Sequence, residues 1–467
     1  MSTDFAVNPF GVPTDHKHLP TYTTPVAALS SVLYTNLNSI FSYKVFSEPD
    51  LLDSAIKKWA QKDSSHLFFK ELDIRSGAGL TALGYSKNNQ QVSGIIAPGY
   101  ALNYFVNTFK HESDTKGKFL FNIGALDYNE HTGEIISDYI TPLNVAAELG
   151  YPVVTPLSTN EVKATSLLSL ALAKFGKNLG AINLFDGANY SKSVLKIDEK
   201  SDDEILDKLS KDLTDGASFE EILDKFNENS EQRLHNFQYT GDENAETVFV
   251  TYGSLESELF STTLQENGSK VGLISIRIPL PFDTDKFVAQ IPSTTKKLVV
   301  IGQSLDGSSP SLLKSKVSAA LFFHGKRDVK ISEYIYQPNF VWSPSAVEQI
   351  ASSFVSGFKA STSPESENFI YWSTDNSANV DLSSRLVHAL SLVDKQDVSL
   401  RTKFDNAANA GVFQAQFTAS PVSSSHTVSN IDSASVSIVE NISILNVFDV
   451  VSTIKKNGTV LIISEKS

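Results

Sequence analysis

Short apolar runs and stretches of helical periodicity alternate along residues 246–322. The expected strands are residues 247–251, 271–278 and 297–302. One expected helix begins after Ser254, and two more cover residues 283–290 and 311–322. Strands that alternate with helices of about 10–15 residues are typical of parallel strands joined by helical crossovers. The pattern therefore predicts an α/β domain with a parallel sheet.

The same alternation precedes this stretch, over residues 25–240. Expected strands cover residues 39–46, 66–74, 92–97, 118–125, 153–156 and 180–185, and expected helices cover residues 26–37 and 158–175, with another capped by Ser47. Long apolar strands of this kind predict a second parallel sheet that is buried on both faces. Capping boxes, in which a serine oxygen and a glutamate satisfy the first helical donors, are predicted for the pairs Ser158/Glu161, Ser201/Glu204 and Ser218/Glu221. Residues 201–235 are charged, and we expect them to form a solvated helical link between domains.

A third unit follows a linker rich in Ser, Glu and Pro at residues 360–367. Its expected elements are strands at residues 369–374, 397–404, 435–440 and 459–464, a helix at residues 382–392, and a long polar loop after residue 404. The predicted fold class is α/β, with consecutive parallel-sheet domains. The predicted division is an N-terminal arm at 1–24, then domains at 25–240, 241–360 and 361–467. The last domain stops abruptly, so we expect the chain to be the front part of something longer.

Composition narrows the function classes. The chain has 467 residues, 41% hydrophobic, and a formal net charge of −14, which disfavours nucleic acid or an anionic membrane as the main partner. It has no cysteine, so thiolate-held iron–sulfur clusters, thiolate zinc sites and a cysteine nucleophile are excluded within it. Neither a signal peptide nor an apolar run of about 20 residues is visible, and a cytoplasmic protein is expected.

One glycine-rich turn resembles a dinucleotide fingerprint. Residues 77–82 read GAGLTA, after an expected strand and before an expected helix. No acidic residue closes the next expected strand to hold a ribose hydroxyl, which favours close packing of helix on sheet over NAD(P) binding. No G-x-S-x-G elbow and no H-E-x-x-H spacing occurs, so we predict no catalytic residue and no metal site within the chain.

Several motifs carry a family resemblance. The Tyr-Gly-Ser turn at 252–254, KVGLISIRIPLPF at 270–282 and KKLVVI at 296–301 resemble the second domain of 2-oxoacid:ferredoxin (pyruvate:ferredoxin) oxidoreductases. The whole chain, from NPFG at 8–11 to KFDNAANAGVFQAQF at 403–417, resembles the N-terminal half of the fungal NADPH sulfite reductase flavoprotein (alpha) components. The resemblance implies a thiamine-binding-like domain, a transketolase C-terminal-like domain and a partial third α/β domain.

The resemblance also implies where the chemistry lies. In that family FAD and NADPH bind in C-terminal domains that these residues do not include, and electrons pass to a beta subunit bearing siroheme and an iron–sulfur cluster. This chain would then be a scaffold or docking region in a hetero-oligomer that reduces sulfite to sulfide for sulfur amino-acid biosynthesis, with no cofactor of its own.

A vestigial thiamine site is the only cofactor position that the resemblance implies here. The oxidoreductases hold the thiamine ring with a glutamate, where this chain has Asp73 in the run DIRSGAG, one methylene shorter. The diphosphate motif is incomplete at FDG 185–187 and at LDG 305–307, and the third domain opens on YWSTDNSA 371–378 without a glycine. Two other classes stay open: a thiamine-dependent 2-oxoacid oxidoreductase subunit, and a non-catalytic interaction module.

Overall fold

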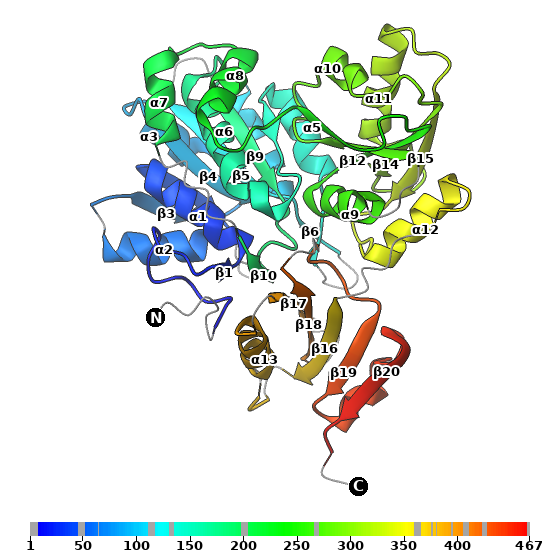
Figure 1. The fold of residues 1–467 in the computed structure, drawn as a ribbon. Coiled ribbons are helices and arrows are strands. Elements are labelled where there is room, and N and C mark those ends of the chain that lie inside the picture. The colour runs from blue at the N-terminus through cyan, green and yellow to red at the C-terminus, as the bar shows by residue number, and fades with distance from the viewer. Residues whose placement is uncertain are drawn as a thin grey trace.

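The described part of the chain forms three large β-sheets, one two-stranded sheet and the helices that cover them (Figure 1). The structure is a computed structural model, and it describes residues 8–44, 52–63, 65–110, 117–129, 135–197, 204–265, 270–358, 366–374, 377–379, 381–393, 396–404, 411–422 and 427–464. Two sheets lie side by side in the upper part of Figure 1, and the third lies below them. The predicted α/β class is confirmed, but the prediction of parallel sheets throughout is wrong for the third sheet, where most neighbouring strands are antiparallel.

The first sheet is parallel throughout, in the order β3-β2-β4-β5-β9-β8. Its strands are β2 Ser39–Tyr43, β3 Phe68–Leu72, β4 Val92–Pro98, β5 Lys118–Gly124, β8 Val153–Val154 and β9 Gly180–Phe185. One face is covered by α1 Pro25–Asn36, α2 Asp53–Lys62, α6 Val162–Phe175, α7 Ile205–Asp212 and α8 Phe219–Asn229. The other face is covered by α3 Leu80–Ser86, η1 Gly99–Tyr104, α4 Val106–Phe109 and α5 Ile140–Leu149. A small hairpin, β6 Asp127–Tyr128 with β7 Ile135–Ile136, lies beside them.

The second sheet has the order β11-β13-β12-β14-β15, with only β11 antiparallel. Its strands are β11 Phe237–Gly241, β12 Thr247–Tyr252, β13 Val271–Ile276, β14 Lys297–Gln303 and β15 Lys330–Tyr336. Its helices are α9 Ser254–Gln265, α10 Thr284–Ala289, α11 Leu312–Phe323 and α12 Pro344–Phe354. One continuous apolar core joins a face of this sheet to a face of the first, so the two pack as one body.

The third sheet is mixed and draws strands from distant parts of the chain. Its order is β1-β10-β17-β18-β16-β19-β20. These strands are β1 Tyr22–Thr23, β10 Ser193–Lys196, β16 Glu367–Thr374, β17 Gln396–Phe404, β18 Val412–Pro421, β19 Ala434–Val439 and β20 Ile454–Ile462, with α13 Leu382–Ser391 and η3 Ile442–Asn446 alongside. Because β10 pairs with β17, residues from the predicted first domain complete the third sheet. The predicted domain boundaries stay a prediction.

The four predicted helix caps had different outcomes. Ser218 caps α8 by accepting the Glu221 N–H at 3.2 Å, as predicted. Ser158 makes no capping hydrogen bond, so the capping box there is wrong, and Glu161 serves a different purpose described below. Ser47 and Ser201, the other two predicted caps, lie outside the described residues.

The long polar loop expected after residue 404 is also wrong in part. Residues 412–421 form β18, a strand that lies between β16 and β17 in the third sheet. Buried Gln414 and Gln416 give it a polar sequence, and each is hydrogen-bonded within the sheet region, where the Gln416 amide donates to Gln414 Oε1 at 2.6 Å. The remaining loop residues, 405–410, lie outside the described residues.

Candidate functional site

The thiamine position that the resemblance implies lies at the edge of the first sheet. Asp73 lies just after β3, the edge strand of the first sheet, and it is exposed to solvent. The Gly79 N–H, which would face a pyrophosphate, donates instead to Tyr43 Oη at 2.9 Å. A Cβ added at Gly79 would lie 2.4 Å from the Phe109 ring. The residues present therefore do not fit thiamine diphosphate or a dinucleotide, because the turn is packed against aromatic rings.

The opening of the third unit is likewise filled by its own side chains. Ser373, Ser377 and Tyr371 donate to the Glu440 carboxylate, the last of them at 3.0 Å. Burial opposes ionisation of this group, but the hydrogen bonds that it accepts hold its pKa below the usual value. A phosphate would need hydrogen-bond donors of this kind, and here those donors are occupied by the chain's own carboxylate.

A shallow hollow of about 860 Å³ lies beside β3. Its lining includes His66, Phe68 and Tyr85, but Asp73 is not part of it. A ring nitrogen of His66 lies 2.7 Å from the Tyr34 carbonyl oxygen, and the Phe68 and Tyr85 rings stack on each other with centroids 5.1 Å apart. These side chains contact other parts of the chain and do not point together at a space where a ligand could bind.

A set of buried and half-buried polar groups lies where the first two sheets meet. Ligands of open α/β sheets bind at the carboxyl ends of parallel strands, and here those ends from both sheets face each other. We call this region the polar junction, and it comprises Tyr139, Thr155, Glu161, Asp186, Tyr252, Ser254, Glu256, Glu258, Arg277, Gln303, Tyr336 and Arg401. Each follows or ends a strand, or lies at the start of the next helix, except Arg401, which comes from β17 of the third sheet.

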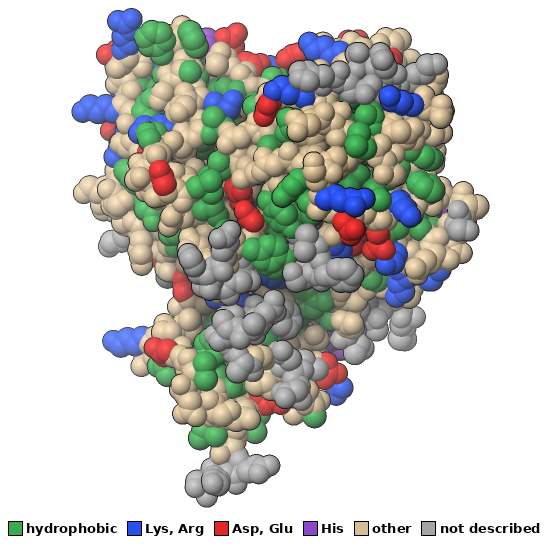
Figure 2. Space-filling view, turned by 180° about the vertical axis from the view of Figure 1, so that it is seen from behind, with side chains coloured by type: hydrophobic (Ala, Val, Ile, Leu, Met, Phe, Trp, Pro, Cys, Tyr) green, Lys and Arg blue, Asp and Glu red, His purple; other side chains and the backbone are tan. Residues whose placement is uncertain are grey.

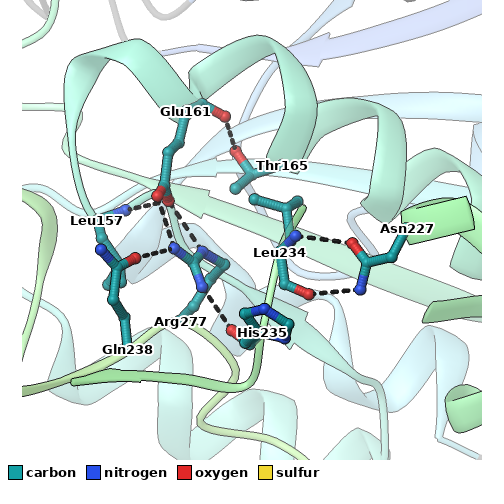
Figure 3. Close-up of polar contacts among 8 residues, drawn as sticks. All are labelled: Leu157, Glu161, Thr165, Asn227, Leu234, His235, Gln238 and Arg277. Atoms are coloured by element: carbon teal, nitrogen blue, oxygen red, sulfur yellow. Dashed lines mark hydrogen bonds and ion pairs between the residues drawn. The ribbon is translucent and has the colours of Figure 1, made fainter. Parts of the chain in front are cut away.

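An ion pair between Glu161 and Arg277 is the strongest contact of the polar junction (Figure 3). Glu161 ends η2, Thr159–Glu161, in the first unit, and Arg277 follows β13 in the second. The pair is bidentate, with Arg277 Nε 2.9 Å from Glu161 Oε2 and Nη2 2.6 Å from Oε1. Arg277 is only 1% exposed, so the pair is screened little by water.

Further donors and acceptors complete the pair, as Figure 3 shows. Arg277 also donates to the His235 carbonyl at 2.5 Å and to Gln238 Oε1 at 2.8 Å. Glu161 Oε2 accepts the Leu157 N–H at 3.0 Å. A buried ion pair is tolerated only when its remaining donors and acceptors are satisfied, and this arrangement satisfies them from both units.

Two glutamates at the start of α9 have raised pKa values. Burial raises the pKa of Glu256 to about 8, with the nearby Asp186 adding to the shift. Tyr336 Oη donates to Glu256 Oε1 at 2.8 Å. Burial also raises the pKa of Glu258 to about 7, with Glu161 contributing, while the Thr159 N–H donates to Glu258 at 3.3 Å. Clusters of buried carboxyl groups with raised pKa values are frequent at functional sites, but they also occur at structural junctions.

Asp186, from the incomplete FDG motif, connects the first unit to the third. Both Asn189 nitrogens donate to its carboxylate, at 3.0 and 2.9 Å, and Arg401 Nη2 donates to Asn189 Oδ1 at 3.2 Å. Burial raises the pKa of Asp186, although these hydrogen bonds and the nearby Arg401 favour its charged form. The motif that resembled half of a diphosphate site thus holds two units together.

The remaining junction contacts also cross between units. The Ser254 N–H donates to Tyr139 Oη at 3.2 Å, the Tyr139 N–H donates to Gln303 Oε1 at 2.9 Å, and the Thr155 and Tyr252 hydroxyls are 3.0 Å apart. No group of three or more potential ligands is placed to hold a metal ion among the described residues. Within these same parts of the chain, no helix is both long enough and apolar enough to cross a bilayer. The hydrogen bonds of the polar junction therefore join the first unit to the second and to the third.

Sequence comparison identifies the relatives of this chain. The sulfite reductase [NADPH] flavoprotein component of Saccharomyces cerevisiae is 54% identical over 473 aligned positions, which cover 100% of this chain and 45% of that protein. The whole chain is homologous to part of this flavoprotein. The predicted resemblance is therefore confirmed, and the chain spans less than half the length of the yeast flavoprotein. No family model matches the chain.

Weaker similarity extends to pyruvate oxidoreductases, as the motifs at residues 252–301 predicted. Pyruvate-flavodoxin oxidoreductase of Nostoc sp. is 34% identical over 112 residues, which cover 23% of this chain and 28% of that protein. Pyruvate:ferredoxin oxidoreductase of Moorella thermoacetica is 22% identical over 339 residues, covering 63% of this chain and 29% of that protein. A solved structure of 2-oxoglutarate:ferredoxin oxidoreductase from Magnetococcus marinus aligns with a TM-score of 0.48 and 12% identity over 71% of this chain and 64% of that one.

Sequence reasoning missed most of the polar junction. Glu161 had a signal, but its position three residues after Ser158 was interpreted as a capping box. Arg277 could have been noticed as a charge inside an apolar strand-like run, because a charge there needs a buried partner. Glu256 and Glu258 lie in a helical pattern that is equally typical of a solvated face, so their burial could not be inferred.

Proposed function

We propose that this chain is the N-terminal part of an assimilatory NADPH-dependent sulfite reductase flavoprotein subunit, and that these residues act as its scaffold or docking region. The proposal rests on the 54% identity to the yeast flavoprotein along the whole chain. FAD and NADPH would bind in domains outside these residues. The partner would be the beta subunit that carries siroheme and an iron–sulfur cluster, and the hetero-oligomer would reduce sulfite to sulfide in the cytoplasm for sulfur amino-acid biosynthesis.

The scaffold role is supported by how the polar junction is filled. At the sheet ends where an α/β enzyme would bind its ligand, the side chains of two units are hydrogen-bonded to one another. A region that has lost its ligand but keeps its fold can still space and orient other domains. We also propose that the thiamine position at Asp73 is vestigial, since that side chain is exposed and the adjacent glycine turn is packed with aromatic rings.

The absorption spectrum of the endogenous protein, purified with whatever extension it has in the cell, tests the assignment. A flavin spectrum that NADPH bleaches is the expected result. A colourless protein that NADPH does not change would overturn the reductase assignment and leave a free-standing interaction module.

Asp73 can be tested in the same preparation. Asp73→Ala is expected to leave sulfite-dependent NADPH oxidation unchanged, with the wild-type protein as the reference and added thiamine diphosphate without effect. Loss of turnover in the variant, restored by thiamine diphosphate, would show a working thiamine site.

A further inference from the structure

The C-terminal end of α11 exposes two adjacent aromatic side chains. Phe323 is 75% exposed, the highest value among the large hydrophobic residues described, and Phe322 at 69% ranks third after Leu392 at 72%. Their ring centroids are 5.9 Å apart, so they form one apolar surface. The residues of α11 that face the core are Val317, Ala320 and Leu321, which are buried. The two phenylalanines therefore project away from the core of their own unit.

The end of this helix is rigidly closed. Gly325 adopts a φ of +65°, and the Lys326 N–H donates back to the Leu321 carbonyl at 3.0 Å, while the Gly325 N–H donates to the Phe322 carbonyl at 3.2 Å. Such a cap fixes the last turn of a helix and the chain that follows it. The aromatic pair is thus held outward by an ordered backbone, and an exposed preorganised pair loses little conformational entropy when it binds.

The surroundings of the pair are basic in an acidic protein. Residues 312–330 contain five Lys or Arg residues and a single carboxylate, Asp328, whereas the whole chain has a net charge of −14. Lys326, Arg327 and Lys330 follow the aromatic pair closely in the sequence, and all three are exposed. His324 is paired with Asp285 at 3.0 Å. Figure 2 shows hydrophobic side chains next to Lys and Arg side chains at the upper left of that face, over the unit that contains α11.

We propose that this aromatic–basic patch, formed by Phe322, Phe323, Lys326, Arg327 and Lys330, is the docking surface for the hemoprotein partner subunit. This inference rests on the proposed function. The partner surface that fits it is acidic around an apolar pocket. Aromatic residues and arginine dominate the binding energy of protein interfaces, and charge complementarity accelerates and orients the encounter.

Binding of the purified hemoprotein subunit to the full-length flavoprotein tests the proposal. Phe322→Ser/Phe323→Ser is expected to weaken the affinity by about 10- to 100-fold, since aromatic anchors carry much of an interface's energy. Lys326→Glu/Arg327→Glu is expected to slow association and to remove most of its salt dependence. All four positions are exposed, so the variants should keep their flavin content and their NADPH-dependent ferricyanide reduction.

Matched controls lie elsewhere on the same chain. Leu392 and Val393, 72% and 48% exposed, form another adjacent apolar pair at the end of α13, and Leu392→Ser/Val393→Ser should leave binding unchanged. Lys208→Glu/Lys211→Glu makes the same charge change on exposed positions of α7 and should have little effect.

The outcomes separate this inference from the proposed function. Failure of the unaltered protein to bind the hemoprotein would overturn the proposed function, and this inference with it. If the unaltered protein binds the hemoprotein and both patch variants bind it equally well, this inference is overturned and the proposed function is not. Two further outcomes would also overturn this inference. If the chain sediments with anionic phosphatidylserine vesicles and the patch substitutions abolish this, the patch binds a membrane. If the chain self-associates and the substitutions abolish this, the patch binds a second copy.

Discussion

At the scale of single residues, the Glu161–Arg277 pair is expected to be essential only as a pair. Arg277→Met should lower the free energy of unfolding by about 3–5 kcal/mol, because it leaves the Glu161 carboxylate buried without its counterion. Glu161→Leu combined with Arg277→Met should cost less than Arg277→Met alone. Urea unfolding of the two single variants and the double variant measures this coupling.

An exposed pair gives the control for that cycle. Arg385→Met removes a cation that lies 2.7 Å from Asp381 on the surface of α13, and it should cost less than about 1 kcal/mol. Additive single and double effects at Glu161 and Arg277 would contradict the view that the two side chains act as one buried unit.

Glu256 is expected to make stability fall as the pH rises. Its pKa is about 8 in the folded chain against 4.5 as the ordinary value, so between these values the folded state holds more protons than the unfolded state. The free energy of unfolding should therefore decrease, by about 1 kcal/mol per pH unit, between about pH 5 and about pH 8. Glu256→Gln stays neutral and can still accept from Tyr336, so it should resemble wild type near pH 5 and be more stable near pH 8.

Urea denaturation at several pH values measures the difference between the two proteins. Glu258 and Asp186, whose pKa values are also raised by burial, are present in both proteins, so the difference reports the ionisation of Glu256 together with its interaction with Asp186. Exposed Glu243→Gln is the control and should run parallel to wild type. A constant offset between Glu256→Gln and wild type at all pH values would rule out ionisation of Glu256 as the cause.

At the scale of elements, two glycines at α3 should respond to alanine with opposite signs. Gly79 precedes the helix with a φ of +91°, and a Cβ there would lie 2.4 Å from the Phe109 ring, so Gly79→Ala should destabilise by about 1–3 kcal/mol. Gly84 lies inside α3 with no atom within 4 Å of an added Cβ, so Gly84→Ala should stabilise by about 0.5–1 kcal/mol. Thermal denaturation of both variants would measure this, and stabilisation by Gly79→Ala would contradict the packed turn.

At the scale of the whole molecule, removal of the third sheet is expected to destabilise the first unit. A chain ending at residue 358 loses β17, the partner of β10, and loses Arg401 beside Asp186. We expect a lower melting temperature than that of the full chain and faster amide exchange in β10. Unchanged exchange in β10, with residues 366–467 folding alone to their native strand content, would support the predicted boundary near residue 360 as a true domain boundary.

The sequence alone determined the alternation of strands and helices and the resemblance that directed the functional proposal. Both are local: periodicity reports which face of an element is buried, and short motifs survive as strings of residues. Most strands of the first two sheets were predicted for that reason, although β11 and β15 were not among them. The strand β18 was missed because its buried glutamines gave its sequence a polar character.

Only the tertiary structure decided which distant residues meet. Glu161 and Arg277 are 116 positions apart, and Asn189 and Arg401 are 212 positions apart, and no local pattern encodes such a pairing. Likewise, β10 pairs with β17, which lies about two hundred residues later in the chain, so the sequence around β10 does not show that it belongs to the third sheet. Whether a carboxyl group stays charged depends on what surrounds it in space, so the raised pKa values of Glu256 and Glu258 and the exposed pair at α11 could be recognised only in the folded chain.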